Sequence, residues 1–108
     1  MEYLNAFKWM LVTKPSLWVG VQDYLLKNPE KEQQIFKYKV AGHSVFPVGG
    51  KIFLCTGRED KPVAIIEVTS YEPTYDKTDP ATIVYFRVAL QLRNSQKHNL
   101  KEVFRYLL

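Results

Sequence analysis

Cysteine and long apolar runs are scarce in this sequence. Its 108 residues contain a single cysteine, Cys55, so no internal disulfide can form and nothing indicates an oxidising compartment. Cys55 lies in the apolar stretch KIFLCTG, where a small buried residue is the simplest interpretation. No apolar run approaches the roughly 18 to 20 residues of a membrane span, and the N-terminus lacks a signal-peptide pattern. We therefore expect an intracellular, cytoplasmic and soluble protein without membrane contact.

Sequence motifs for metal binding and catalysis are also lacking. The two histidines, His43 and His98, and the single cysteine lie far apart, without CxxC or HxxxH spacing. The stretch VGGK at 48–51 lacks the further glycine and the Ser/Thr of a phosphate-binding loop. A pair of Cys55 and His43 has no signature of nucleophilic catalysis around it. The sequence predicts no metal, no cofactor and no enzymatic activity.

Aromatic residues and positive charge are what the chain has in excess. Aromatic residues make up 14% of the sequence, so some rings could face a ligand, although a small domain also fills its core with rings. The net charge is +4, which is compatible with a polyanionic partner. Residues 81–108 account for all of it, because they carry only Glu102 against Arg87, Arg93, Lys97, Lys101 and Arg105.

The order of periodic segments predicts a single α+β domain over residues 1–108. Pro15 ends the first strand, and a helix is expected from Ser16, as its N-cap, to the Asn28-Pro29 boundary. A second, amphipathic helix is expected over 100–108, capped by Asn99. The apolar centre of 62–71 indicates a central strand. Short turns favour a curled, mostly antiparallel sheet of five to six strands, an open barrel flanked by two helices. Its strands are expected at 8–13, 35–40, 51–56, 62–71 and 82–92.

Four segments of the chain together resemble an EVE domain. WMLVTKPSLW at 9–18 is similar to the opening of such domains, and 45–80, from VFPVGGK to YDKTDP, is similar to their centre. IVYFRVALQL at 83–92 and NLKEVFRYL at 99–107 are similar to the last strand and the closing helix. Lys51 departs from the pattern, since the family usually has an acidic residue there. EVE domains belong to the PUA-like superfamily together with YTH and ASCH domains, so the resemblance implies a PUA-like fold.

The resemblance also implies a function. EVE and YTH domains bind nucleic acid and take one modified base, flipped from its strand, into an aromatic-walled pocket. Related modules form the DNA-reading end of some modification-dependent restriction systems. The implied partner is therefore DNA or RNA that carries a modified base, methylated for example, and the domain could be fused to or associated with a larger effector protein.

Such a site needs rings that stack on the base, polar groups for its edge and basic residues for phosphates. Trp18 is the first candidate for the slot, with packing on the inner face of the helix as the alternative. The other candidates for the base pocket are Phe46, His43, Tyr71, Tyr75, Thr13, Ser16 and Ser44. The candidates for phosphate binding are Lys14, Lys37, Lys39, Arg87 and Arg93, of which Lys37 and Lys39 must share one face of a strand.

Two other functions remain open. Some ASCH relatives hydrolyse modified nucleosides, but Gly50, Lys51 and Glu67 are only fragments of the ASCH signature. A protein–protein interaction domain is the other alternative, because an exposed strand edge and an amphipathic C-terminal helix can each bind a partner.

Overall fold

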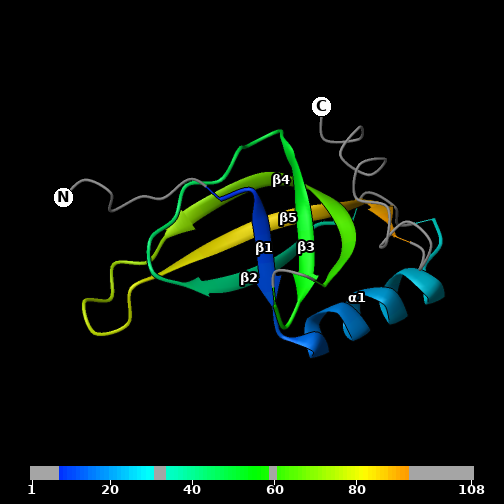
Figure 1. Cartoon of the computed structure of the whole chain (residues 1–108), viewed down its shortest axis with the longest axis horizontal. Helices are drawn as coiled ribbons and strands as arrows, with labels where there is room; N and C mark the ends of the chain where they lie inside the picture. The colour runs from blue at the N-terminus through cyan, green and yellow to red at the C-terminus, as the bar shows by residue number, and fades with distance from the viewer. Residues whose placement is uncertain (1–7, 31–33, 59–60, 93–108) are drawn as a thin grey trace.

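In the residues that the structure describes, the fold is a curled five-stranded sheet with one helix packed on its inner face. It is described from a computed structural model that covers residues 8–30, 34–58 and 61–92. The elements, in chain order, are β1 (Met10–Thr13), α1 (Pro15–Lys27), β2 (Phe36–Ala41), β3 (Lys51–Thr56), β4 (Pro62–Pro73) and β5 (Ala81–Gln91). The strands are arranged in the order β1-β3-β4-β5-β2 and form a half-barrel, with α1 packed against it (Figure 1).

The strand pairing makes the sheet mixed. β1 runs parallel to β3, whereas the pairs β3–β4, β4–β5 and β2–β5 are antiparallel. β4 lies between β3 and β5, which confirms the central position predicted for 62–71. The α+β class and the curled sheet are also confirmed, and the described residues form five strands. The part of the chain that the structure describes contains one helix, and the second helix expected over 100–108 lies outside that part.

The helix α1 begins two residues earlier than the sequence predicted. Pro15 occupies the first turn and Lys14 is the N-cap, with an extended backbone and no capping side-chain hydrogen bond. The prediction of Ser16 as N-cap was therefore wrong: proline lacks the N–H that a first helical position does not need, and its φ is already helical. The Lys14 N–H donates to the hydroxyl of Tyr38 at 3.1 Å, which ties the start of α1 to β2. The helix ends at Lys27, as predicted.

The core has two clusters on opposite faces of the sheet. The larger cluster fills the inner face beneath α1, which contributes Trp18 and Val21. Alternate residues of β3, β4 and β5 complete it, among them Ile52, Leu54, Ala64, Ile66, Val68, Val84 and Phe86. The smaller cluster lies on the outer face and contains Phe53, Cys55, Ile65 and Leu92, so Cys55 is buried as predicted.

The loop between β2 and β3 is fastened to β5 by the buried hydroxyl of Thr82. This hydroxyl donates to the carbonyl of Gly42 at 2.8 Å and accepts the N–H of Ser44 at 3.0 Å. Further along the loop, Gly49 has a φ of +80°, which favours glycine, and its N–H donates to the carbonyl of Val68 at 2.7 Å. The loop held in this way places Phe46 in the inner core, where it is 3% exposed.

The length of the helix bears on the membrane prediction. α1 has 13 residues. Within residues 8–30, 34–58 and 61–92, no helix is long and apolar enough to span a bilayer.

Candidate nucleic-acid interface

Three of the predicted phosphate-binding residues lie together on the outer face of β2 and β5. Lys37 is directly opposite Tyr85 in the sheet, and Lys39 is opposite Ile83. Arg87 follows Tyr85 by two residues on β5 and therefore points to the same face. Val84 and Phe86, which alternate with them, are buried in the inner core. The prediction that Lys37 and Lys39 share a strand face is thus confirmed, since both are exposed and alternate with partly buried neighbours.

Carboxylates neutralise much of the positive charge of this face. The Arg87 guanidinium makes a bidentate pair with Glu67, with Nη2 at 3.0 Å and 3.1 Å from the two carboxylate oxygens. The Lys39 ammonium lies 3.2 Å from an oxygen of Asp79 in an exposed pair. Within the described ranges Lys37 makes no ion pair, so its charge is the most readily available to a phosphate.

Tyr85 provides an aromatic ring in the middle of these cations. Its hydroxyl donates to a carboxylate oxygen of Glu72 at 2.9 Å. This hydrogen bond, together with desolvation and the negative charge of Glu72, raises the pKa of the Tyr85 phenol above its usual value of 10.0. The ring is half-buried and stays neutral at physiological pH. It can therefore stack on a base without a repulsive charge of its own.

The predicted base-pocket residues divide into an interior group and a surface group. Trp18 is 7% exposed and belongs to the inner core, which is the packing alternative that the sequence left open. Phe46 packs edge-to-face against Tyr71, with ring centroids 5.8 Å apart. The Thr13 hydroxyl donates to the carbonyl of Cys55, and Ser44 is buried beside Thr82. In their present positions, Trp18 and Phe46 pack against other core side chains and do not line a surface slot.

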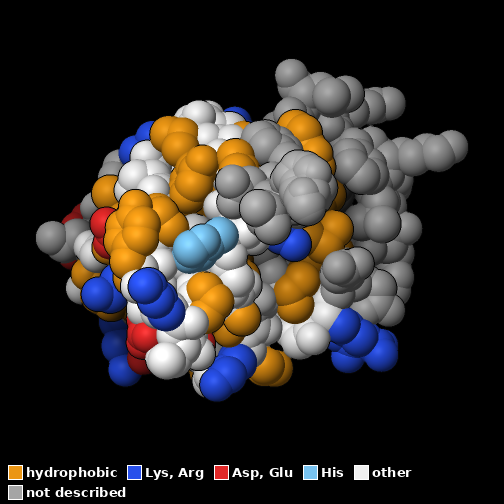
Figure 2. All heavy atoms as spheres, turned by 90° about the vertical axis from the view of Figure 1, so that its left-hand side faces the viewer, with side chains coloured by type: hydrophobic (Ala, Val, Ile, Leu, Met, Phe, Trp, Pro, Cys, Tyr) orange, Lys and Arg blue, Asp and Glu red, His pale blue; other side chains and the backbone are white. Residues whose placement is uncertain are grey.

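The surface group lies mainly at the end of the sheet where the loops gather. Tyr75 is 86% exposed on the loop between β4 and β5. His43 is exposed on the loop after β2, and its Nε2 donates to the carbonyl of Thr74 at 2.9 Å. Figure 2 shows the histidine among apolar and basic side chains at this end of the molecule. Lys14 and Ser16 are exposed at the start of α1, next to Tyr38, and Arg93 lies outside the described residues.

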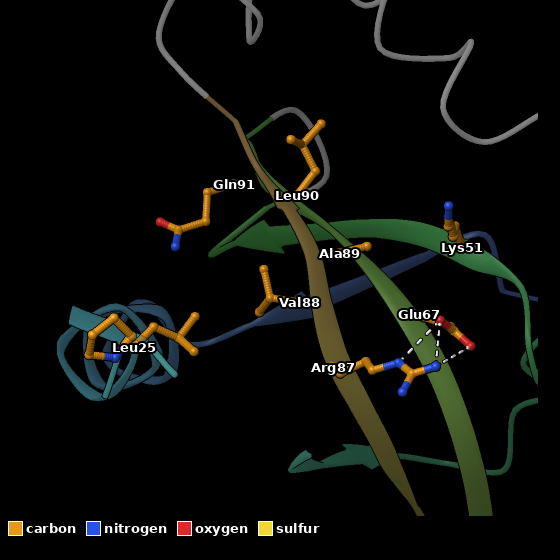
Figure 3. A pocket seen from close by; sticks show the side chains of 9 residues that line it. Leu25, Lys51, Glu67, Arg87, Val88, Ala89, Leu90 and Gln91 are labelled. Atoms are coloured by element: carbon orange, nitrogen blue, oxygen red, sulfur yellow. Dashed lines mark hydrogen bonds and ion pairs between the residues drawn. The ribbon is translucent and has the colours of Figure 1, made fainter. Parts of the chain in front are cut away.

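A cavity that the sequence did not predict lies beside the last residues of β5 (Figure 3). Its volume is about 620 Å³. It is lined by Leu25, Pro29, Lys51, Glu67, Arg87, Val88, Ala89, Leu90 and Gln91. The sequence signal was a difference in expected strand length, because the strand expected at 82–92 is longer than the one at 35–40, but only the structure shows that these two strands pair.

Neither the arrangement of possible metal ligands among the described residues nor a comparison with known proteins assigns a function to the site. In the part of the chain that the structure describes, no three His, Cys, Asp or Glu side chains are grouped so that they could hold a metal ion. A scan against protein-family models finds no match, and comparisons with curated proteins and with solved structures find none. The likeness to EVE domains therefore depends on the sequence motifs, and the observed fold is a curled mixed sheet with a helix.

Proposed function

We propose that this domain binds nucleic acid with the outer face of β2 and β5. The observation that carries the proposal is the placement of Lys37, Lys39 and Arg87 around Tyr85 on one exposed sheet face. Basic side chains of this kind neutralise phosphates, and an aromatic ring between them can stack on an unpaired base. A single-stranded segment suits the arrangement better than a duplex, because stacking on Tyr85 requires an exposed base.

The carboxylates next to the cations set the expected strength of binding. A phosphate has to compete with Glu67 for Arg87 and with Asp79 for Lys39, whereas Lys37 can bind without such competition. The affinity should therefore be modest and should fall steeply with salt, as expected when phosphate contacts supply most of the free energy.

Recognition of a modified base is a finer proposal that depends on the resemblance to EVE domains. A slot walled by Trp18 or Phe46 would require α1 or the β2–β3 loop to move, because both rings lie in the inner core. Tyr75 and His43 are exposed and can be reached without a rearrangement. A base held outside the core would therefore use these two residues first.

The test is fluorescence anisotropy with short labelled DNA and RNA oligonucleotides, single- and double-stranded, at low and moderate salt. Each is unmodified or carries one 6-methyladenine, 5-methylcytosine or 5-hydroxymethylcytosine. The double variant Lys37→Gln/Lys39→Gln should weaken binding several-fold and lower the salt slope by about one for each phosphate that is no longer neutralised. Lys27→Gln is the matched control, since Lys27 is an exposed lysine on α1, paired with Asp23, away from the sheet face.

Each outcome decides a part of the proposal. Binding that is weakened several-fold in the Lys37→Gln/Lys39→Gln variant and kept in Lys27→Gln supports this face as the interface. Equal weakening in both variants would mean that only the overall charge matters, and absence of binding at low salt would reject the function. A tenfold preference for one modified base, reduced in Tyr75→Ala or His43→Ala, would support the finer proposal.

A further inference from the structure

The outer face of β2, β5 and β4 changes in chemical character from one strand to the next. Two rows of opposed residues cross it, and they consist of Lys39, Ile83 and Glu72 and of Lys37, Tyr85 and Ser70. The lysines lie on β2, at one end of the strand order, and the oxygen-bearing side chains lie on β4. The lysines, Ser70 and Glu72 are exposed. The Tyr85 ring therefore has cations on one side and hydrogen-bond acceptors on the other.

An irregularity in β4 does not disturb this arrangement. The register of β4 against β5 shifts between Val68 and Ser70. Beyond the shift, Ser70 is opposite Tyr85 and Glu72 is opposite Ile83. The hydroxyl of Tyr85 donates to a carboxylate oxygen of Glu72 at 2.9 Å. This hydrogen bond places the ring and the carboxylate on one face without any assumption about strand alternation.

The carboxylate of Glu72 keeps most of its capacity to accept hydrogen bonds. One of its oxygens accepts from the Tyr85 hydroxyl. Among the described residues, the other oxygen makes no hydrogen bond and no ion pair. An ionised carboxylate offers about four acceptor positions in all. Glu67, on the same strand, differs because both of its oxygens are bonded to the Arg87 guanidinium (Figure 3).

A carboxylate beside a stacked base discriminates between the bases. A base that stacks on the Tyr85 ring extends past its hydroxyl, so one edge of the base approaches Glu72. The Watson–Crick edge of guanine has two neighbouring donors, N1–H and the N2 amino group, which match the two oxygens of a carboxylate. Adenine and cytosine place a ring-nitrogen acceptor next to their amino group, and thymine and uracil place their N–H between two carbonyls. Those acceptors are repelled by the negative charge, so guanine fits this position best.

We infer that Tyr85 and Glu72 form a base site that selects guanine in a single strand. The inference rests on the proposed nucleic-acid function and adds a sequence preference to it. The sugar–phosphate backbone follows the two exposed lysines of β2, and the base stacks on Tyr85. The N1–H and N2 amino groups of the base donate to Glu72. The site does not involve Arg87, which stays paired with Glu67.

The test is fluorescence anisotropy at low salt with short, labelled, single-stranded oligothymidylates whose central base is varied. Guanine at the centre should bind tighter than adenine, cytosine or thymine by about fivefold or more, the lower end of what a bidentate base contact contributes. Adenine controls for the stacking of a purine. Inosine keeps N1–H but lacks the amino group, so its affinity should lie between those of guanine and adenine. These comparisons need no protein variant and are unaffected by changes in folding.

Protein variants locate the preference. Glu72→Gln keeps the shape of the side chain and an acceptor for the Tyr85 hydroxyl, but it replaces one carboxylate oxygen by an N–H donor. It should abolish the guanine preference without weakening the thymidine-only oligonucleotide. Glu30→Gln makes the same charge change on an exposed glutamate after α1 and should keep the preference. Lys37→Gln/Lys39→Gln should weaken all oligonucleotides by a similar factor and leave the ratio between them unchanged. Thermal melting of each variant checks the fold.

The outcomes separate this inference from the function on which it rests. A guanine preference that is lost in Glu72→Gln and kept in Glu30→Gln supports the site. Equal, salt-sensitive binding of all oligonucleotides overturns the guanine site and leaves the nucleic-acid function standing. A preference that persists in folded Glu72→Gln, or inosine binding as tightly as guanine, also overturns it, because stacking alone would then explain the difference. Absence of any binding at low salt rejects the function and the site together.

Discussion

The inner face of the sheet and the outer face of β2 and β5 use aromatic residues in opposite ways. On the inner face, Trp18, Phe46 and Phe86 are closely packed beneath α1 and make the core. On the outer face of β2 and β5, Tyr85 remains half-buried among lysine, arginine and carboxylate side chains. The difference shows that aromatic rings build the core on the inner face, whereas the outer face of β2 and β5 leaves the Tyr85 ring partly exposed.

The largest expected effect is the replacement of an inner-face ring. Trp18→Ala should lower the free energy of unfolding by about 3–5 kcal/mol, because it removes a buried indole and leaves a cavity under α1. Chemical denaturation measures the decrease. Tyr85→Ala is the matched change on the outer face and should cost about 1 kcal/mol or less, the range of a cross-strand contact. Similar decreases in the two variants would contradict the division of roles between the faces.

A smaller decrease in stability is expected when the hydrogen bonds that hold the β2–β3 loop to β5 are removed. Thr82→Val keeps the shape of the side chain but removes the hydroxyl that bonds Gly42 and Ser44. Two backbone groups are then left without their partner, and the free energy of unfolding should fall by about 1–3 kcal/mol. Thr78→Val, an exposed threonine in the β4–β5 loop, is the control and should change stability by about 0.5 kcal/mol or less. If the control costs as much as Thr82→Val, burial of the hydroxyl is not what matters.

The smallest effect is expected on the pKa of the Tyr85 phenol, on the outer face of β5. The pKa of the Tyr85 phenol should lie above 10.0, because its hydroxyl donates to Glu72 and the ionised form would face that carboxylate. The folded-state pKa is raised, so the stabilisation is present below pH 10.0 and disappears as the pH rises through the folded value. NMR of ring-labelled tyrosine, assigned with Tyr85→Phe, measures the midpoint. Glu72→Gln should lower it, and an unchanged midpoint would show that Glu72 is not the cause.

The sequence predicted the strands well because their signals are local. The strand at 51–56 has the bounds that the loop before it and the turn at 57–60 indicated, and the apolar run at 62–71 is the central strand. The predicted start of α1 was wrong by two positions, since the helical φ of Pro15 outweighs the capping tendency of Ser16. The base-pocket residues were chosen as aromatic or hydroxyl residues near turns. Local sequence does not say which face such a residue takes, and Trp18 and Phe46 face inward.

The sequence by itself determined the α+β class, the absence of an internal disulfide, the positions of the strands and the shared face of Lys37 and Lys39. These properties follow from composition and from periods of two and 3.6 residues, which act over a few neighbouring positions. Only the tertiary structure decided which strands pair, that Arg87 joins Lys37 around Tyr85, and that β5 extends past β2 beside a cavity. These features join segments far apart in the chain, and their geometry depends on how the curled sheet brings those segments together.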